Sequence, residues 1–350
     1  MAAPIPDTLR RRLAGYRMPA EWELHKATYL TWPHNPETWP GKFDPVPAQY
    51  AAVVAGLSRF EPVRVLVKDA DAAEQARAML QQVDARMESV EIIVELTNDS
   101  WIRDYGPIFV ARTDGARVAL DWKFNSWGEK YGAYDLDDVV PRRLAIRYGF
   151  ECLEVPLVLE GGSIDVNGVG SLLTTESCLL NPNRNPGMTR VEIEEYLRVY
   201  LGVSNILWLG DGIAGDDTDG HVDDLARFVA GDTIVTVIED DRNDDNYQPL
   251  AENLERLRAM RDQDGKPFRI ETLPMPPALY HEGQRLPASY ANFYLANGAV
   301  IVPTFGCPSD KQSLTTLARL FPNRKVLGFY CLDLVWGLGT VHCLSQQHPA

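Results

Sequence analysis

The feature that most constrains the fold of this chain is a series of helical segments at nearly constant spacing. Five stretches have the apolar periodicity and the helix-forming residues of amphipathic helices. They begin near Ala70, Asp135, Thr189, Tyr247 and Ser309. The intervals between these starts run from 54 to 65 residues, which is a repeat of about 60 residues. In the second stretch we expect the helix itself to begin at Pro141, because proline is tolerated in a first turn.

Short runs rich in β-branched residues separate the helices, and we expect them to be strands. They cover residues 63–67, 90–94, 118–122, 233–238, 268–273, 299–302 and 326–329. A unit of two or three strands and one helix cannot bury its hydrophobic face alone. Packing five such units around a central axis buries these faces, so the sequence predicts an α/β propeller. A doubly wound sheet is the alternative, but no Gly-x-Gly-x-x-Gly motif follows the first strand.

Composition indicates one globular domain. The chain has 350 residues, of which 45% are hydrophobic and 24% are charged, a usual balance for a globular protein. No Gly/Ser-rich linker divides it, so we expect a single domain over residues 1–350, with residues 1–17 as an N-terminal extension. No apolar run approaches the ~18 residues of a membrane helix, and none follows residues 10–12 as in a secretory signal. The five dispersed cysteines form no Cys-x-x-Cys pair, which argues against disulfides and zinc and favours the cytoplasm.

The net charge limits the class of partner. The formal charge is −15 at pH 7, so the surface repels phosphates and a nucleic-acid partner is not expected. An acidic cleft speeds the encounter with a small cation. We therefore expect a small cationic substrate, no nucleic acid and no membrane partner, and we leave a homo-oligomer open.

Four short segments combine ionisable residues with glycine and aromatic or polar neighbours. They are residues 98–107, 159–163, 215–224 and 337–347, and they contain Asp104, Glu160, His221 with Asp223, and Cys343. Each follows the predicted helix of one repeat, and equivalent positions in a ring of repeats face the same axis. The remaining equivalent position falls near Asn292. The repeat therefore predicts a central funnel lined by these side chains.

The residue types in this funnel favour one kind of chemistry. A cysteine and a histidine supply a nucleophile and a proton carrier. A ring of carboxylates would repel the oxyanion of ester or amide hydrolysis, but it would bind a planar cation such as guanidinium in a bidentate manner. These carboxylates belong to Asp104, Glu160, Asp217 and Asp223. Flat apolar walls would exclude water around the cation; the candidates are Trp32, Trp101, Trp127 and Trp336.

These segments resemble those of the agmatine deiminases, of the guanidine-modifying superfamily that includes arginine deiminases and bacterial peptidylarginine deiminases. The resemblance runs through MPAEWE, TWPHNP, WIRDYGP, FNSWG, LEGGSI, TTESCLLNPNRNP, GDDTDGHVDD, ASYANFYLANG and HCLSQQHP. It implies a five-bladed α/β propeller of pseudo-fivefold ββαβ repeats (the pentein fold) around a central active-site funnel. It also implies hydrolysis of agmatine to N-carbamoylputrescine and ammonia, a step of polyamine metabolism, with no metal or organic cofactor.

The resemblance also implies a role for each site residue. Cys343 would attack the guanidinium carbon and form an amidino-cysteine intermediate. Asp104 and Asp223 would bind the guanidinium nitrogens, His221 would protonate the departing ammonia and then activate water, and Glu160 would hold the histidine side of the site. The positions that would line the substrate are Trp101, Asp217 and Asn292.

Three departures or rivals qualify this interpretation. Residues 337–340 read GLGT where the family usually has GGGN, and Asp165 stands where the family often has a histidine. The loop leaves open a different guanidine, such as arginine or peptidyl-arginine, as substrate. A propeller that only binds a cation or a protein is the third hypothesis. His342 is a rival base, but in a strand it would face away from the pocket of Cys343. Cys178 is expected to be buried and not catalytic.

Overall fold

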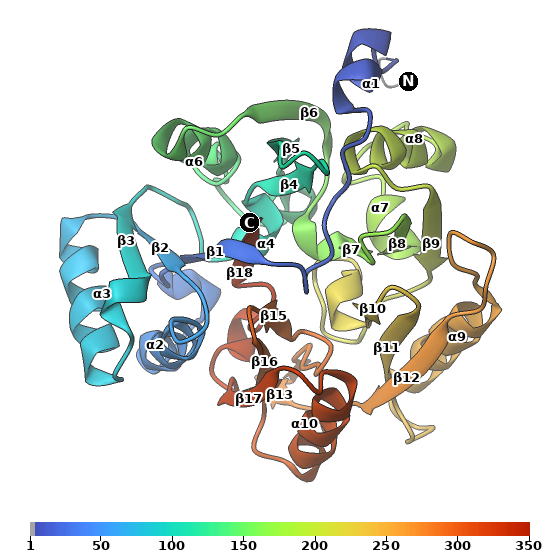
Figure 1. Cartoon of the computed structure of the whole chain (residues 1–350). Helices are drawn as coiled ribbons and strands as arrows, with labels where there is room; N and C mark the ends of the chain where they lie inside the picture. The colour runs from blue at the N-terminus through green and yellow to red at the C-terminus, as the bar shows by residue number, and fades with distance from the viewer. Residues whose placement is uncertain (1–3) are drawn as a thin grey trace.

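The computed structural model describes residues 4–350, and they form a mixed α/β fold. This range contains five sheets of three or four strands and one two-stranded hairpin, β13 (Tyr280–His281) and β14 (Gln284–Arg285). The five sheets are arranged around a common centre, and the long helices lie at the periphery (Figure 1). Residues 1–3 of the predicted extension lie outside the described residues. No helix in the described range is long and apolar enough to cross a membrane.

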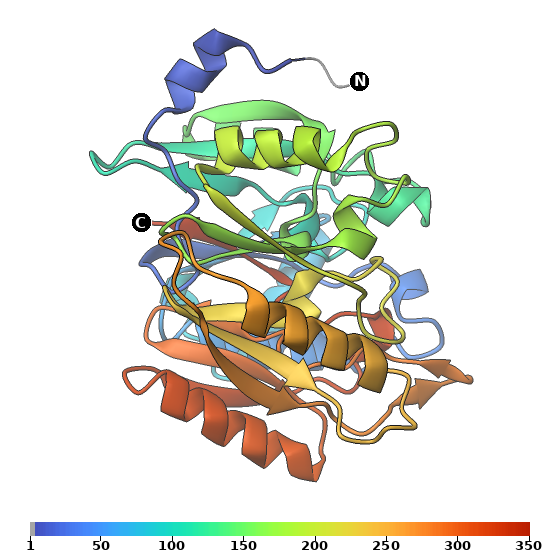
Figure 2. The ribbon, with the colours of Figure 1, turned by 90° about the vertical axis from the view of Figure 1, so that its right-hand side faces the viewer.

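Four of the sheets in this range share one connectivity. The first two strands pair antiparallel, a helix follows, and the third strand pairs parallel with the second. The helix covers the outside of its sheet, as α8 and α9 show in the side view (Figure 2). The four units are β4 (Ile108–Ala111), β5 (Arg117–Lys123), α6 (Val140–Tyr148) and β6 (Cys152–Val158); β7 (Asp165–Val166), β8 (Ser171–Thr175), α8 (Arg190–Leu201) and β9 (Asn205–Leu209); β10 (Ala226–Ala230), β11 (Thr233–Ile238), α9 (Tyr247–Ala259) and β12 (Arg269–Pro274); and β15 (Tyr294–Ala296), β16 (Ala299–Thr304), α10 (Pro308–Leu320) and β17 (Lys325–Tyr330).

The fifth sheet joins the two ends of the chain. Its order is β18 (Ser345–Pro349), β1 (His25–Thr31), β2 (Val63–Val67) and β3 (Val90–Val94). The last strand, β18, pairs antiparallel with β1, with Leu30 opposite Ser345. Helix α2 (Val46–Leu57) connects β1 to β2, and α3 (Ala70–Gln82) connects β2 to β3. The sheet therefore repeats the connectivity of the other four, with β18 as its first strand and with α3 and β3 added.

Local sequence patterns predicted most of these elements. The five predicted helices are α3, α6, α8, α9 and α10, and Pro141 lies in the first turn of α6 as expected. Helix α8 begins after the N-cap Thr189, which forms a capping box with Glu192. The seven predicted strands are also confirmed, as β2, β3, β5, β11, β12, β16 and β17.

Helix α2 was not predicted, and it changes the assignment of the repeat. Most of its residues are buried, so it has no polar face and no amphipathic period. It lies against the neighbouring unit, where Gly56 faces the Phe329 ring so closely that a methyl group would lie 2.3 Å from a ring carbon. By connectivity α2, and not α3, corresponds to the helices of the other units. The prediction that the helix at Ala70 starts the repeat was therefore wrong.

The first strand of each unit lies nearest the centre, and the predicted site segments precede these strands (Figure 1). Asp104 is in the short helix α4 (Ile102–Tyr105) before β4, and Glu160 precedes the 3-10 turn Gly161–Ser163 before β7. His221 and Asp223 occupy the turn before β10. Asn292 and Cys343 come two residues before β15 and β18. The fold therefore brings the five segments to one place.

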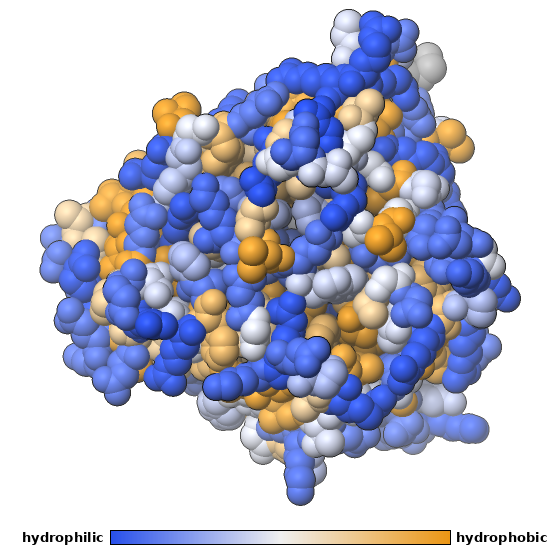
Figure 3. Space-filling view, in the orientation of Figure 1, coloured by the Kyte–Doolittle hydropathy of each residue, from blue (hydrophilic) through white to orange (hydrophobic). Residues whose placement is uncertain are grey.

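The outer surface fits the composition of the chain. The face shown in Figure 3 is mostly hydrophilic, with scattered hydrophobic residues. The described part of the predicted N-terminal extension contains α1 (Asp7–Leu13), which contacts α8 through an ion pair between Arg10 and Glu195. Surface ion pairs of this kind contribute little to stability. That residues 1–17 are an extension of a single domain remains a prediction.

Candidate active site

Cys343 lies in a turn over residues 341–344 and is 8% exposed. It lines a cavity of about 530 Å³ together with Asp104, Trp101 and Asp217. The Nδ2 group of Asn292 donates a hydrogen bond to its sulfur at 3.0 Å. The thiol is therefore held at the cavity wall by a side chain from the neighbouring unit.

Two aspartates lie close to this thiol or share its cavity. Asp104 accepts hydrogen bonds from Trp127 Nε1 and from the Gly162 amide, both at 2.9 Å. Asp223 Oδ2 lies 3.8 Å from Cys343 Sγ. Its other oxygen, Oδ1, is buried and has no hydrogen-bond partner among the described residues. The Asp104 carboxylate is thus fixed by two hydrogen-bond donors, whereas the Asp223 carboxylate keeps one oxygen free.

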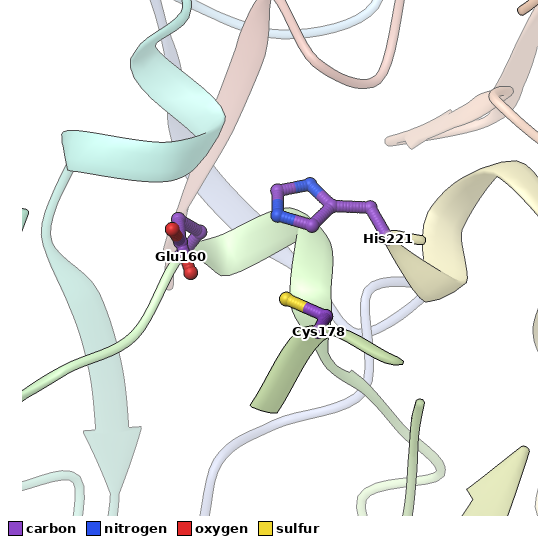
Figure 4. A group of neighbouring side chains, drawn as sticks. All are labelled: Glu160, Cys178 and His221. Carbon is purple, nitrogen blue, oxygen red and sulfur yellow. The ribbon is translucent and has the colours of Figure 1, made fainter. Parts of the chain in front are cut away.

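His221 and Glu160 complete the acidic and basic groups (Figure 4). His221 is 1% exposed, and its Nδ1 lies 3.7 Å from Asp104 Oδ1. Its side chain, the Cys178 thiol and the Glu160 carboxylate have ligand atoms within 4.8 Å of one another. Glu160 Oε1 accepts a 2.6 Å hydrogen bond from Arg184 Nε, whereas Glu160 Oε2 and both His221 nitrogens lack partners in the described range. Cys178 is buried as predicted.

Burial and charge set the protonation of the site. Burial raises the pKa of Cys343 well above its usual value, and the charges of Asp223, Asp224 and Asp104 raise it further. Burial alone would lower the pKa of His221, but Asp104 and Cys178 raise it well above 6.5. The unliganded site therefore holds a neutral thiol and a protonated histidine at neutral pH.

The glycines of the LEGGS segment are needed because other groups approach their backbone. A methyl group on Gly161 would lie 2.2 Å from the Arg103 carbonyl oxygen. One on Gly162 would lie 2.6 Å from His221 Nδ1, 2.9 Å from Asp104 Oδ1 and 3.1 Å from Asp223 Oδ2. Three side chains from two other units thus converge on the backbone at Gly162.

The three residues predicted to line the substrate lie at the cavity or next to Cys343. Trp101 and Asp217 line the cavity, and Asp217 accepts a hydrogen bond from the Tyr131 hydroxyl. Asn292 contacts Cys343 and also accepts from the Thr340 hydroxyl at 2.6 Å. All eight predicted site residues are therefore brought together. Of the four candidate tryptophans, Trp32 does not line the cavity but packs in the core against Tyr50, whereas the other three line it.

His342 lies outside the cavity as expected, but for a different reason. The chain at His342 is a turn and β18 begins at Ser345, so the alternation of a strand does not apply. The ring does not line the cavity. Its Nδ1 contacts Asp223 Oδ2 at 2.6 Å, and its Nε2 contacts Glu21 Oε2 at 2.7 Å. Because both nitrogens are engaged by carboxylates, His342 is not a free base for Cys343.

Three further residues of the site were not predicted. Asp224 and Cys343 have ligand atoms within 4.8 Å of each other. Arg184 holds Glu160 and also contacts Asp219. Glu21 belongs to the MPAEWE segment, which was noted only for its resemblance. These positions carried a weak signal, because an ion pair between residues remote in sequence leaves no local pattern.

The sequence model of the Porphyromonas-type peptidyl-arginine deiminase family matches residues 17–349. The chain belongs to this family. Among its relatives, a putative agmatine deiminase of Legionella pneumophila is 39% identical over 96% of this chain and 95% of its own length. An agmatine deiminase of Pseudomonas aeruginosa is 39% identical over 97% of both.

Solved structures of the deiminases have the same fold. The agmatine deiminase of Enterococcus faecalis has a TM-score of 0.91 and 32% identity, and the match covers 100% of this chain and 99% of that one. A putative arginine deiminase of Porphyromonas gingivalis has a TM-score of 0.88 and 38% identity, over 95% and 98% of the two chains. The resemblance inferred from the sequence is therefore confirmed at the level of the family and of the α/β fold.

In this deiminase the GLGT loop has an unusual backbone. Leu338 adopts a left-handed conformation, with φ of 69°, and lines the cavity. Such a conformation costs a leucine about 1–2 kcal/mol. Its neighbours must be glycine, because a methyl group on Gly337 would lie 2.6 Å from Trp39 Nε1 and one on Gly339 would lie 2.5 Å from the Trp101 ring. A strained apolar residue therefore stands at the cavity wall next to Cys343.

Proposed function

We propose that this protein hydrolyses agmatine to N-carbamoylputrescine and ammonia through a covalent amidino-cysteine. The observation that carries the proposal is a set of buried polar atoms in the site that have no hydrogen-bond partner among the described residues. They are Glu160 Oε2, Asp223 Oδ1 and both nitrogens of His221, and of these residues Asp223 lies closest to the Cys343 thiol, at 3.8 Å through its other oxygen. A buried polar atom without a partner costs free energy. Guanidinium offers five N–H donors in a plane, and the free oxygen of Asp223 would accept one of them.

Electrostatics would couple substrate binding to activation of the nucleophile. In the free enzyme burial and the surrounding carboxylates raise the pKa of the Cys343 thiol and keep it neutral. A bound guanidinium brings a positive charge next to those carboxylates and lowers the cost of a thiolate. The thiol proton then passes to solvent, and the thiolate forms only while the substrate is in place, so it is not exposed to other reactions. Relatives over nearly the full length are named agmatine deiminase, which supports this substrate.

Each step has a residue of this chain in reach. Asp104 and Asp223 would hold the guanidinium so that its carbon faces Cys343, and such orientation lowers the barrier. Sulfur then attacks the carbon, and protonated His221 gives its proton to the nitrogen that leaves as ammonia. His221, now neutral, would take a proton from water, whose oxygen attacks the amidino carbon and releases the ureido product and the thiol. Proton transfer of this kind contributes about 10²–10⁴-fold.

The walls of the cavity would bind the rest of the substrate. Trp101 and Trp127 present aromatic rings beside the cation. Asp217 would receive the amine at the other end of the aliphatic chain. We also propose that the five units are the blades of a pseudo-fivefold propeller, that residues 1–350 are one domain, and that the protein acts in the cytoplasm.

Mass spectrometry of protein quenched during turnover tests the proposal. With agmatine we expect an added amidino group on the peptide that contains Cys343, and ammonia release. A panel of agmatine, free arginine and an arginyl peptide then decides the substrate. Faster turnover of arginine or of the peptide would show that agmatine is not the preferred substrate. Turnover without any modification of Cys343 would overturn the covalent route.

The Leu338→Gly variant tests whether the loop contributes to the choice of substrate. The apolar wall disfavours the carboxylate that distinguishes arginine from agmatine, so we expect the preference for agmatine in kcat/KM to fall about tenfold. Asp84→Gly is the matched control, because Asp84 also has positive φ, of 53°, but does not line the cavity. An unchanged preference in Leu338→Gly would show that the leucine has no part in selectivity.

A further inference from the structure

His342 connects the candidate site to a buried charge network beneath it. The ring is 1% exposed and lies between two carboxylates, Asp223 at Nδ1 and Glu21 at Nε2. Its backbone carbonyl accepts a hydrogen bond from Arg103 Nε at 3.2 Å. No other histidine in the described range joins two carboxylates through its two nitrogens, although His25 contacts one, Glu61.

This geometry defines the protonation state of the ring. An ionised carboxylate can only accept hydrogen bonds, and a neutral imidazole has one donor and one acceptor nitrogen. With ionised carboxylates at 2.6 Å and 2.7 Å, both nitrogens are satisfied only as donors. A ring that donates from both nitrogens carries a positive charge directly behind Asp223.

Glu21 holds the far side of this bridge in place. Its Oε1 accepts from the Leu295 amide at 2.8 Å and lies 3.0 Å from Arg227 Nη2. Its Oε2 lies 3.4 Å from Arg103 Nη2. Two arginines and a backbone amide thus fix Glu21, which in turn fixes the imidazolium. The ring cannot rotate away from Asp223 without breaking a second charged contact.

Asp223 needs such support because its surroundings oppose its charge. It is buried among Asp104, Asp224 and the Cys343 thiol, and burial alone would raise its pKa. The hydrogen bond and charge of His342 reverse this and lower the pKa of Asp223 below its usual value. His342 binds Oδ2 and leaves Oδ1 free for a ligand.

We propose that His342 is a positioning residue, an imidazolium that donates to both carboxylates, keeps Asp223 ionised and aims its free oxygen at the guanidinium. This inference rests on the proposed function, because it assigns His342 a part in guanidinium binding. It acts through Asp223 and does not touch the substrate. The two neighbouring residues then have separate roles. His342 keeps Asp223 charged, and Cys343 attacks the guanidinium carbon.

The test measures agmatine binding by calorimetry in the Cys343→Ala background, where no turnover occurs. We expect His342→Gln to weaken binding about 10- to 100-fold at pH 7, the range for hydrogen bonds to charged groups. Asp223 binds only when ionised, and without the imidazolium its pKa rises. When the pH is lowered, the variant should therefore lose agmatine binding earlier, at a higher pH than the parent does. The other charged groups facing the ring, from the elements packed against it, are Glu21, Arg103, Arg227 and Asp165, and they are unchanged.

Two controls separate positioning from a general loss of packing. In an Asp223→Asn background, His342→Gln should add no further loss, because the carboxylate it serves is gone. His348→Gln removes another buried histidine, which stacks on Phe109 and whose pKa burial lowers to about 3, so that it is neutral. It should leave agmatine binding unchanged.

The outcomes distinguish the two proposals. If the Cys343→Ala parent does not bind agmatine, the proposed substrate is wrong and the same comparison is run with the guanidine that the substrate panel identifies. If the parent binds and His342→Gln binds equally well, or loses affinity equally at every pH and also in Asp223→Asn, the positioning role is wrong. Should His342→Gln not fold, nitrogen-15 NMR of histidines in the wild-type protein decides. Two protonated nitrogens on His342 at pH 8 support the proposal, and one overturns it.

Discussion

The Cys343→Ala variant should release no measurable ammonia from agmatine while still binding it. Loss of a nucleophile that acts together with its proton carrier costs about 10⁴-fold or more in kcat. Binding should persist, because the groups proposed to hold the guanidinium are carboxylates on other units, and Asp104 keeps its hydrogen bonds from Trp127 and Gly162. Removing the thiol removes no charge, because burial and three aspartates keep it neutral, so the folded state should not be weakened.

Ammonia release and agmatine affinity are to be measured on the same preparation. Cys152→Ala is the matched control, since Cys152 is a half-buried free cysteine in β6, outside the cavity, and it should keep full activity. Turnover near the wild-type rate in Cys343→Ala would show that Cys343 is not the nucleophile. Loss of both binding and turnover with an intact fold would mean that Cys343 contributes to binding itself. A binding module without catalysis would show no ammonia release even in the wild type.

The Gly162→Ala variant should lose activity about 100-fold or more, because displacing reacting groups by about 1 Å has an effect of this size. The added methyl group would lie 2.6 Å from His221 Nδ1 and 2.9 Å from Asp104 Oδ1, so both must move. Overpacking in a buried site costs about 1–3 kcal/mol of unfolding free energy, so the protein should still fold. The effect comes from geometry, since no charge or donor is removed.

Steady-state kinetics and a thermal unfolding midpoint check this result together. Gly231→Ala is the matched control: its nearest atom to an added methyl group is 3.7 Å away, on Val169, and it should change neither quantity appreciably. Activity close to wild type in Gly162→Ala would mean that His221 and Asp104 tolerate displacement, and it would argue against their proposed roles at the guanidinium.

How far sequence reasoning reaches is clearest at the helices. Helices such as α8 and α10 present one polar and one apolar face, so the neighbours in sequence already record which side is buried. Helix α2 is mostly buried, against α3 of its own sheet and against β16 and β17 of the neighbouring unit, so its own residues show no amphipathic period. Its placement, and the correction of the repeat that follows from it, depend on contacts with residues such as Phe329.

The same division holds in the site. The residue types that can do this chemistry are visible in short segments, and a repeat of constant length in a ring brings equivalent positions to one axis, so Cys343, His221, Asp104 and Asp223 could be named in advance. Which atoms remain free could not be named. That depends on pairs remote in sequence, such as Arg184 with Glu160 and His342 with Glu21.

By itself, then, the sequence determined four of the five repeated units, the residues near their centre and the family. The tertiary structure alone decided that β18 pairs with β1, so that one sheet joins the two ends of the chain, and that a histidine beside the thiol faces two carboxylates. The physical reason is one of range. Helix and strand formation depends on residues a few positions apart. The protonation and orientation of a buried group depend on whatever charges the completed fold places around it.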